Sequence, residues 1–184
     1  MPLSQLDKQP VLIVIDLQKG NVSLPMARPT KEITDRSASL ARAFRHRGFP
    51  VVLVNVAGGA PGRTDTMGNF DPPADWAELV EELSQHTNDH VITKPRWGAF
   101  YDSGLEQLLK RLCVTQVFLC GIATSIGAES TARQAHEHSY HVVLVEDAMT
   151  DPASEAHHHS VRNIFPRLGE VTDTAAVLAA LNAG

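Results

Sequence analysis

Charged side chains stand at the ends of two apolar runs in the sequence. Asp16 directly follows the run "VLIVI" at 11–15, and Lys94 closes the run "HVITK" at 90–94, with Arg96 two residues further on. If these runs are parallel strands of one sheet, the acid, the amine and the guanidinium meet at the carboxyl edge, where open α/β sheets bind ligands. Burial raises the pKa of a carboxylate and a nearby ammonium lowers it, and the balance decides whether Asp16 can act as a general acid. A strand-end aspartate can equally be a structural cap, so the pair alone leaves both interpretations open.

The stretch "GIATSIGAEST" at 121–131 lies between an apolar run and a helix-like segment, as in a turn that presents a nucleophile. Glycine stands at position 127, at the start of the expected helix, where such a nucleophile would be placed. A covalent thioester or thioimidate intermediate is therefore not available at this position. Cys120 does not replace the thiol simply, because it lies seven residues earlier inside the apolar run and is expected to be an inert core residue.

Short apolar runs alternate with longer amphipathic segments along the chain. The runs are rich in β-branched residues and nearly continuous, which is typical of strands buried on both faces. Strands and helices that alternate with right-handed crossovers predict a parallel sheet covered on both faces, a three-layer α/β/α sandwich. Expected strands are 11–17, 51–56, 90–94, 116–121 and 141–147, with a sixth at 170–174 left open; expected helices are 31–47, 74–85, 103–112, 125–139, 153–164 and 174–182.

The composition restricts the classes of partner. The formal net charge is −5 and no basic block occurs, which argues against nucleic-acid binding. The apolar runs reach about seven residues, far below the roughly 20 that cross a bilayer, and the N-terminus is polar. Two cysteines make no disulfide framework or zinc site. We therefore expect a single domain over 1–184 in the reducing cytoplasm, with no membrane contact.

Three segments, "VIDLQKG", "ITKPRWGAFYDSGLEQLLK" and "GIATSIGAESTARQA", resemble the signature segments of the isochorismatase-like hydrolase superfamily. A fourth, "EDAMTDPASEAHHHSV", resembles a less specific segment of that family, so the resemblance covers 11 to about 165. It implies a six-stranded parallel sheet in an α/β/α sandwich, a small-molecule substrate and a homodimer or homotetramer. Nicotinamidase relatives carry an Asp/His metal motif after the second strand, but this chain has no histidine there, so we expect neither a metal nor a cofactor.

The resemblance assigns roles residue by residue. The acidic residue of the family falls on Asp16 and its lysine on Lys94, whereas its nucleophilic cysteine falls on Gly127. A non-proline cis peptide of the family would fall at Ile122–Ala123. Together with the polar and aromatic residues expected at the same sheet edge, this gives the candidate substrate contacts Gln18, Arg96, Trp97, Phe100, Ile122, Ala123, Thr124 and Ser125.

True isochorismatases also have glycine in place of the cysteine. Their aspartate protonates the methylene carbon of a vinyl ether, water captures the oxocarbenium ion, and pyruvate leaves. The resemblance therefore implies a cysteine-independent hydrolase of a small carboxylate-bearing metabolite. In it Asp16 is the general acid, Lys94 orients it and Arg96 binds a substrate carboxylate. The following residues, "AESTAR", instead resemble the cysteine-hydrolase branches, and the whole pattern is similar to a stand-alone bacterial subgroup with this glycine.

Two alternatives stay open. The chain could be a non-catalytic protein that binds a small metabolite or acts as an oligomeric scaffold. The other alternative is an amidohydrolase that uses either an activated water or Thr124 or Ser125, for which the sequence offers no obvious base. The triple histidine at 157–159 is expected at a helix surface or subunit contact rather than at a metal site, because adjacent helical residues point in different directions.

Overall fold

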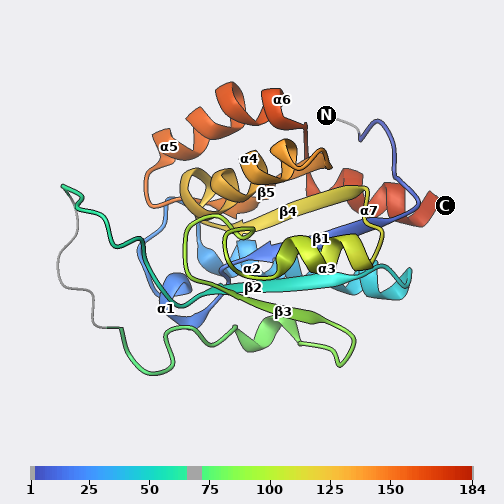
Figure 1. Cartoon of the computed structure of the whole chain (residues 1–184). Helices are drawn as coiled ribbons and strands as arrows, with labels where there is room; N and C mark the ends of the chain where they lie inside the picture. The colour runs from blue at the N-terminus through green and yellow to red at the C-terminus, as the bar shows by residue number, and fades with distance from the viewer. Residues whose placement is uncertain (1–2, 66–71, 184) are drawn as a thin grey trace.

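The computed structural model describes residues 3–65 and 72–183 of the protein. Its centre is one six-stranded sheet in the order β3-β2-β1-β4-β5-β6, in which all neighbours are parallel. Helices cover both faces, which confirms the α/β/α sandwich (Figure 1). The strands are β1 Pro10–Ile15, β2 Val51–Val56, β3 His90–Lys94, β4 Gln116–Ile122, β5 His141–Thr150 and β6 Glu170–Thr172.

Strand β1 lies in the middle of the sheet and is buried along its whole length. Its last residue, Ile15, pairs with Val54 of β2 on one side and with Gly121 of β4 on the other. Because neighbouring parallel strands end at the same edge, whatever follows β1 lies between the ends of β2 and β4. This register places Asp16 in the middle of the carboxyl edge.

The two faces of the sheet carry separate hydrophobic cores. Leu12 and Val14 of β1 pack in the core that contains Phe44, on the face covered by α2 and α7. Val11, Ile13 and Ile15 point the other way, into the core with the leucines of α3 and the alanines of α4. Full burial of each such aliphatic side chain contributes roughly 1.5–3 kcal/mol to folding. The α-helices are α1 Lys19–Val22, α2 Thr30–His46, α3 Leu105–Arg111, α4 Glu129–Glu137, α5 Ser154–His159, α6 Phe165–Leu168 and α7 Thr174–Ala183.

The helix expected at 74–85 is wrong. The segment contains turns, an isolated β-bridge from Leu79 to Gln18 and the short 3₁₀ helix η1, Glu81–Leu83. The carbonyls of Trp76 and Glu78 accept hydrogen bonds from the N–H groups of Gly20 and Lys19, which follow β1. These carbonyls therefore accept hydrogen bonds from a distant segment and not from the N–H groups four residues later, as an α-helix would require.

The helix expected at 153–164 is present but is not uniform. It begins as α5, passes through the π-helical turn η3, Ser160–Ile164, and continues as α6. A second π-helical turn, η2, covers Thr124–Ala128 just before α4. Single π turns inside α-helices are frequent at functional sites, and η2 belongs to the stretch that the sequence singled out.

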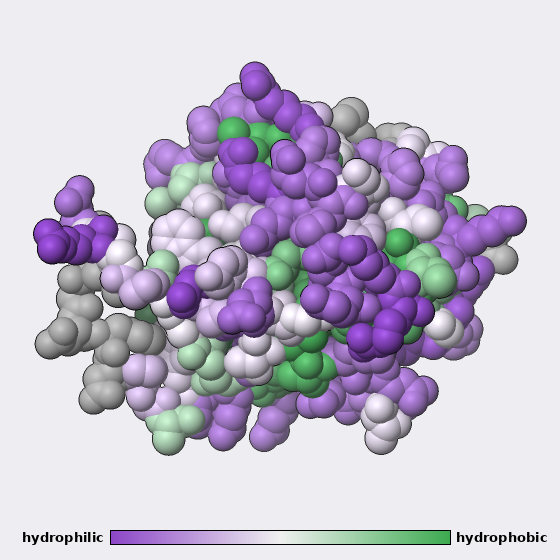
Figure 2. Space-filling view, in the orientation of Figure 1, coloured by the Kyte–Doolittle hydropathy of each residue, from purple (hydrophilic) through white to green (hydrophobic). Residues whose placement is uncertain are grey.

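Strand β3 differs from the run buried on both faces that the sequence predicted at 90–94. Strand β3 is an edge strand whose side chains alternate between the core and the surface, and Val91 is 44% exposed. Figure 2 shows a mainly hydrophilic face on which hydrophobic residues form small separate groups. Among the residues that the structure describes, no helix is both long and apolar enough to cross a membrane.

Candidate active site

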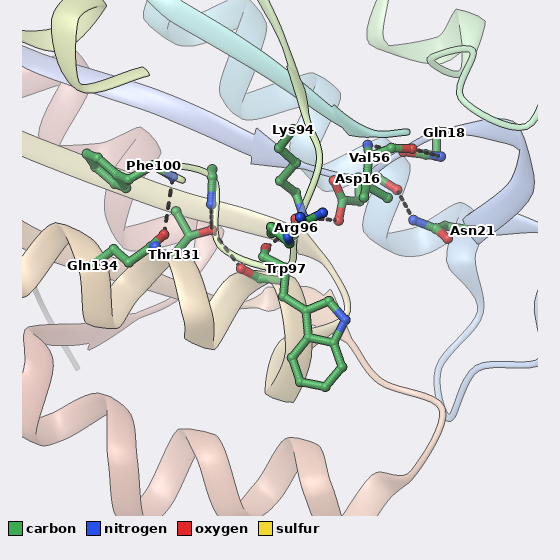
Figure 3. Close-up of polar contacts among 12 residues, drawn as sticks. Asp16, Gln18, Asn21, Val56, Lys94, Arg96, Trp97, Phe100, Thr131 and Gln134 are labelled. Atoms are coloured by element: carbon green, nitrogen blue, oxygen red, sulfur yellow. Dashed lines mark hydrogen bonds and ion pairs between the residues drawn. The ribbon is translucent and has the colours of Figure 1, made fainter. Parts of the chain in front are cut away.

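Asp16 is the first residue after β1 and lies buried at the carboxyl edge of the sheet. Its backbone has a positive φ of 52°, and its N–H donates to Val54 O at 2.8 Å. The side chain thereby leaves the strand direction, and Oδ2 approaches the Lys94 ammonium to 2.8 Å (Figure 3). The other carboxylate oxygen, Oδ1, is buried and has no hydrogen-bond partner among the described residues.

Lys94 is the last residue of β3, and its side chain is 1% exposed. Besides Asp16, its ammonium donates to the carbonyls of Arg96 at 3.1 Å and Trp97 at 2.7 Å (Figure 3). An ammonium has three N–H groups, and these three acceptors satisfy all of them. Lys94 is therefore a fixed structural cation that holds one oxygen of Asp16.

Burial raises the pKa of Asp16 from 3.8 to about 6, although the charge and the hydrogen bond of Lys94 act to lower it. Desolvation outweighs the ion pair because the carboxylate leaves water while only one of its oxygens gains a partner. Near neutral pH the group can thus exist in both protonation states. Such a pKa suits proton transfer in either direction.

The strand-to-helix turn approaches Asp16 from β4. Gly121 has φ of +113°, and a Cβ at this position would stand 2.0 Å from Ile15 O. The next peptide bond but one, Ile122–Ala123, is cis. Gly127 lies within η2, and a Cβ added to it would stand 3.0 Å from Asp16 Oδ2. Position 127 therefore faces the carboxylate directly, and glycine offers no nucleophile there.

Side chains from the end of β5 and from α5 hold this turn in place. Asp151 Oδ2 accepts hydrogen bonds from both the N–H and the hydroxyl of Ser125, each at 2.8 Å. His157 Nδ1 lies 2.7 Å from Thr124 Oγ1, and Arg28 Nη2 lies 3.0 Å from His157 Nε2. Because an arginine can only donate, Nε2 accepts and Nδ1 carries the proton that His157 donates to Thr124.

His157 corrects an expectation from the sequence, since it is buried rather than on a helix surface. Burial, followed by the charge of Arg28, lowers its pKa to about 4, so the ring is neutral at physiological pH. Its two neighbours, His158 and His159, are exposed, as expected for this helix. Within 3–65 and 72–183, no group of three or more His, Cys, Asp or Glu side chains could hold a metal ion.

A cavity of about 200 Å³ opens beside the Asp16–Lys94 pair. Of the residues predicted from the sequence, it is lined by Trp97, Ile122 and Ala123, together with Gly127. Asn21, whose side-chain amide donates to Asp16 O at 3.3 Å, also borders it. Most of the wall is apolar, and it includes five residues that no sequence motif had pointed to: Leu24, Met26, Val56, Ile126 and Pro152.

Gln18 does not line the cavity, although it lies two residues from Asp16. Its buried amide accepts a hydrogen bond from Val56 N–H at 2.7 Å and donates to Val56 O at 3.1 Å (Figure 3). It also donates to Trp76 O at 3.1 Å. Gln18 therefore ties the segment after β1 to the end of β2 and to the 72–80 segment, which positions Asp16 without reaching a ligand.

Arg96 was expected to bind a substrate carboxylate, but its side chain is engaged elsewhere. Its Nη1 donates to Gly59 O at 2.6 Å and to Pro95 O at 2.8 Å. The guanidinium lies over the Tyr101 ring, 5.4 Å from its centroid. Arg96 thus fastens the 57–59 loop to the segment after β3, and it does not border the cavity.

Phe100, Thr124 and Ser125 also lie outside the cavity wall. Phe100 stacks on His138 with ring centroids 5.0 Å apart, and its N–H donates to Gln134 Oε1 (Figure 3). The hydroxyl groups of Thr124 and Ser125 are hydrogen-bonded to His157 and Asp151, respectively. These three residues hold the segments around the cavity in place and do not border it.

Comparisons with known proteins agree with this arrangement. The family model described as "Isochorismatase domain" matches residues 10–176. The uncharacterized isochorismatase family protein YwoC of Bacillus subtilis is 39% identical over 176 residues, covering 91% of each chain. The corresponding Escherichia coli O157:H7 protein YecD is 38% identical, covering 95% of this chain and 97% of its own. A ureidoacrylate amidohydrolase, RutB of Methylorubrum extorquens, is 33% identical over 94% of this chain and 82% of its own.

A solved structure shows the same fold. The isochorismatase family protein of Burkholderia thailandensis is 38% identical and superposes with a TM-score of 0.93 over 98% of both chains. N-carbamoylsarcosine amidase from Thermoplasma acidophilum, at 23% identity and a TM-score of 0.74, shares the fold. With the family match, the closely similar relatives and the parallel six-stranded sheet in agreement, the chain belongs to the isochorismatase family of hydrolases.

Proposed function

We propose that the protein hydrolyses a small molecule by proton transfer from Asp16, without a covalent enzyme intermediate. The observation that carries this proposal is the buried Asp16 carboxyl, with one oxygen held by Lys94, the other without a partner and a pKa of about 6. A carboxyl kept in this state costs stability, which is expected where it serves the chemistry. Gly127 beside it excludes a nucleophile at the family cysteine position.

The reaction that fits best is hydrolysis of an enol ether. Lys94 occupies Oδ2, so the acidic proton of Asp16 sits on Oδ1. Transfer of that proton to the methylene carbon uses the π pair of the double bond and leaves an oxocarbenium ion. Water adds to the cationic carbon and returns a proton to the Asp16 carboxylate. The resulting hemiacetal or hemiketal then collapses to a carbonyl compound and an alcohol. The apolar wall keeps bulk water from the cation until addition.

A second reaction is favoured by the position of Gly127. A Cβ there would stand 3.0 Å from Asp16 Oδ2, so the carboxylate faces the place from which a nucleophile would attack. In this reading ionised Asp16 acts as a general base on water, which attacks an amide or ester carbon. The similar RutB proteins are amidohydrolases, which supports this alternative. Asp16 then supplies the base for which the sequence offered no obvious candidate.

Deuterium incorporation and the pH profile separate the two reactions. Purified protein is given ethyl vinyl ether in D₂O, and the products are followed by NMR. The enol-ether reaction places one deuterium on the new methyl group, whereas acyl hydrolysis of a small amide or ester places none on carbon. For the acid role kcat/KM falls as pH rises through about 6, and for the base role it rises over the same range.

Asp16→Asn keeps the shape of the side chain but carries no exchangeable acid, so we expect a loss of turnover of at least about 100-fold. The matched control is Asp35→Asn, which removes an exposed carboxylate paired with Lys31 and leaves turnover unchanged. Full activity in Asp16→Asn would contradict both proposed reactions. It would leave the fold and family assignment in place.

A further inference from the structure

We propose that the cavity beside Asp16 accepts an uncharged, mainly apolar substrate and rejects carboxylates. The inference rests on the proposed function, since it concerns the ligand of the same site. It replaces the carboxylate-bearing substrate that the sequence had suggested. The reason is that the cationic side chains near the cavity already interact with acceptors of the protein itself.

The charge of Lys94 is not free for a ligand. Lys94 is the one Lys or Arg among the described residues that line the cavity. All three of its N–H groups have acceptors, one of which is the Asp16 carboxylate. A substrate carboxylate would have to displace a backbone carbonyl from a buried ammonium or compete with Asp16 for it. Either change leaves a buried polar group without a partner, which weakens binding of the carboxylate.

Among the residues that the structure describes, no other Lys, Arg or His lines the cavity. Arg96 is fastened to Gly59 O and covers Tyr101, and Arg28 donates to His157. The segment 66–71, which the structure does not describe, has the sequence "TMGNFD" and so contains no Lys, Arg or His.

The rest of the wall favours an uncharged ligand. Leu24, Met26, Val56 and Ile126 surround the pair, and the cavity of about 200 Å³ is below the usual range for drug-sized ligands. A carboxylate placed here would be desolvated beside an ionised Asp16, and the described wall offers it no cation other than the fully engaged Lys94. A neutral molecule with one hydroxyl or amide N–H could instead donate to the carboxylate of Asp16, which lines the cavity.

The test measures binding rather than turnover. Isobutyramide and isobutyrate have the same shape and differ in charge at pH 7.5. Their affinities for the protein are determined by titration with ¹H–¹⁵N NMR, with the indole N–H of Trp97, which borders the cavity, as a reporter. We expect the amide to bind at least tenfold more tightly than the carboxylate. Equal or tighter binding of the carboxylate overturns the inference, and so does the absence of binding of both at 100 mM.

A pair of charge-adding variants gives a sharper comparison. Leu24 borders the cavity and is 43% exposed, so Leu24→Lys brings an ammonium without an assigned acceptor to the rim. Val91 is 44% exposed on β3 and does not border the cavity, so Val91→Lys adds the same charge elsewhere. We expect Leu24→Lys to raise carboxylate affinity at least fivefold and Val91→Lys to leave it unchanged. An equal effect of the two variants would show that overall charge, not the cavity, decides the preference.

Failure of this inference and failure of the proposed function are distinguishable. If no enol ether, amide or ester is turned over but the amide still binds selectively, the substrate class stands and the reaction is wrong. If the carboxylate binds tightly while Asp16→Asn abolishes turnover, the reaction stands and the substrate class is wrong.

Discussion

Burial of Asp16 is unfavourable for its charged form, and this is what brings its pKa close to neutral pH. Its carboxylate is buried, and one oxygen lacks a hydrogen-bond partner among the described residues. Buried ion pairs repay their desolvation only when the remaining lone pairs are satisfied, which is not the case here. The result is a carboxyl whose two protonation states are close in free energy near neutral pH. Burial raises this pKa and Lys94 lowers it. The influence of Lys94 can be removed by substituting that residue alone.

Removing the charge of Lys94 should shift the balance in a defined direction. Lys94→Met retains an unbranched apolar side chain of similar length but neither the charge nor the hydrogen bond, both of which lower the pKa of Asp16. We expect the Asp16 titration, followed by ¹³C NMR of the carboxyl carbon, to move from about 6 to a higher pH. Asp16→Asn identifies the resonance by its absence. An unchanged or lower midpoint in Lys94→Met would mean that Lys94 does not act on the carboxyl as proposed.

For single residues, the sequence predicts where a residue lies in the fold better than the direction in which its side chain points. Asp16 and Lys94 meet because each stands at the end of a parallel strand, and that much follows from the pattern of apolar runs. Arg96 stands only two residues from Lys94, yet its side chain turns to Gly59. Its direction depends on a loop carbonyl and an aromatic ring brought near by the fold, which no local pattern encodes.

At the scale of the element, the register between β1 and β4 brings the turn to the acid. Ile15 pairs with Gly121, and the close approach leaves no space for a side chain at position 121. The strands themselves were predictable because β-branched runs alternate with helical segments. The failed helix at 74–85 was not, because its carbonyls are taken by N–H groups of the distant segment after β1. The π-helical turns η2 and η3 likewise leave no distinct signal in hydrophobic periodicity.

Gly121 tests this description of the register. Gly121→Ala places a Cβ 2.0 Å from Ile15 O at a residue with φ of +113°, so backbone must move in the middle of the sheet. We expect a loss of at least about 3 kcal/mol in the free energy of unfolding, or failure to fold. Gly59→Ala is the control, since a Cβ there meets nothing within 4 Å, and its effect should stay within about 0.5 kcal/mol. Urea unfolding measures both, and wild-type stability in Gly121→Ala would contradict the register.

At the scale of the whole molecule, the raised pKa of Asp16 couples folding to pH. The folded protein binds this proton more tightly than the unfolded chain, with a pKa of about 6 against 3.8. The stabilisation that follows is fully present below pH 3.8 and is lost as pH rises through about 6. Most carboxylates in ion pairs act in the opposite sense, so this contribution can be recognised by its sign.

Asp16→Asn removes this coupling and makes it measurable. The difference in the free energy of unfolding between wild type and Asp16→Asn should change by about 2–3 kcal/mol between pH 4 and pH 7, with wild type relatively more stable at pH 4. Urea unfolding at several pH values gives the difference directly. The control Asp35→Asn removes an exposed ion pair and should shift stability by less than about 1 kcal/mol at every pH. A difference for Asp16→Asn that does not vary with pH would show that the carboxyl titrates normally.

The glycine at position 127 also bears on how the protein withstands chemical attack. The chain has two cysteines, and neither is at the site. Cys120 is fully buried with its pKa raised to about 12, and exposed Cys113 lies between α3 and the start of β4, at the amino edge of the sheet. A hydrolase that depends on a thiolate is silenced by peroxide or by alkylating metabolites. Peroxide does not oxidise a carboxyl, so we expect the reaction proposed for Asp16 to persist at peroxide concentrations that inactivate a thiol enzyme of the same fold.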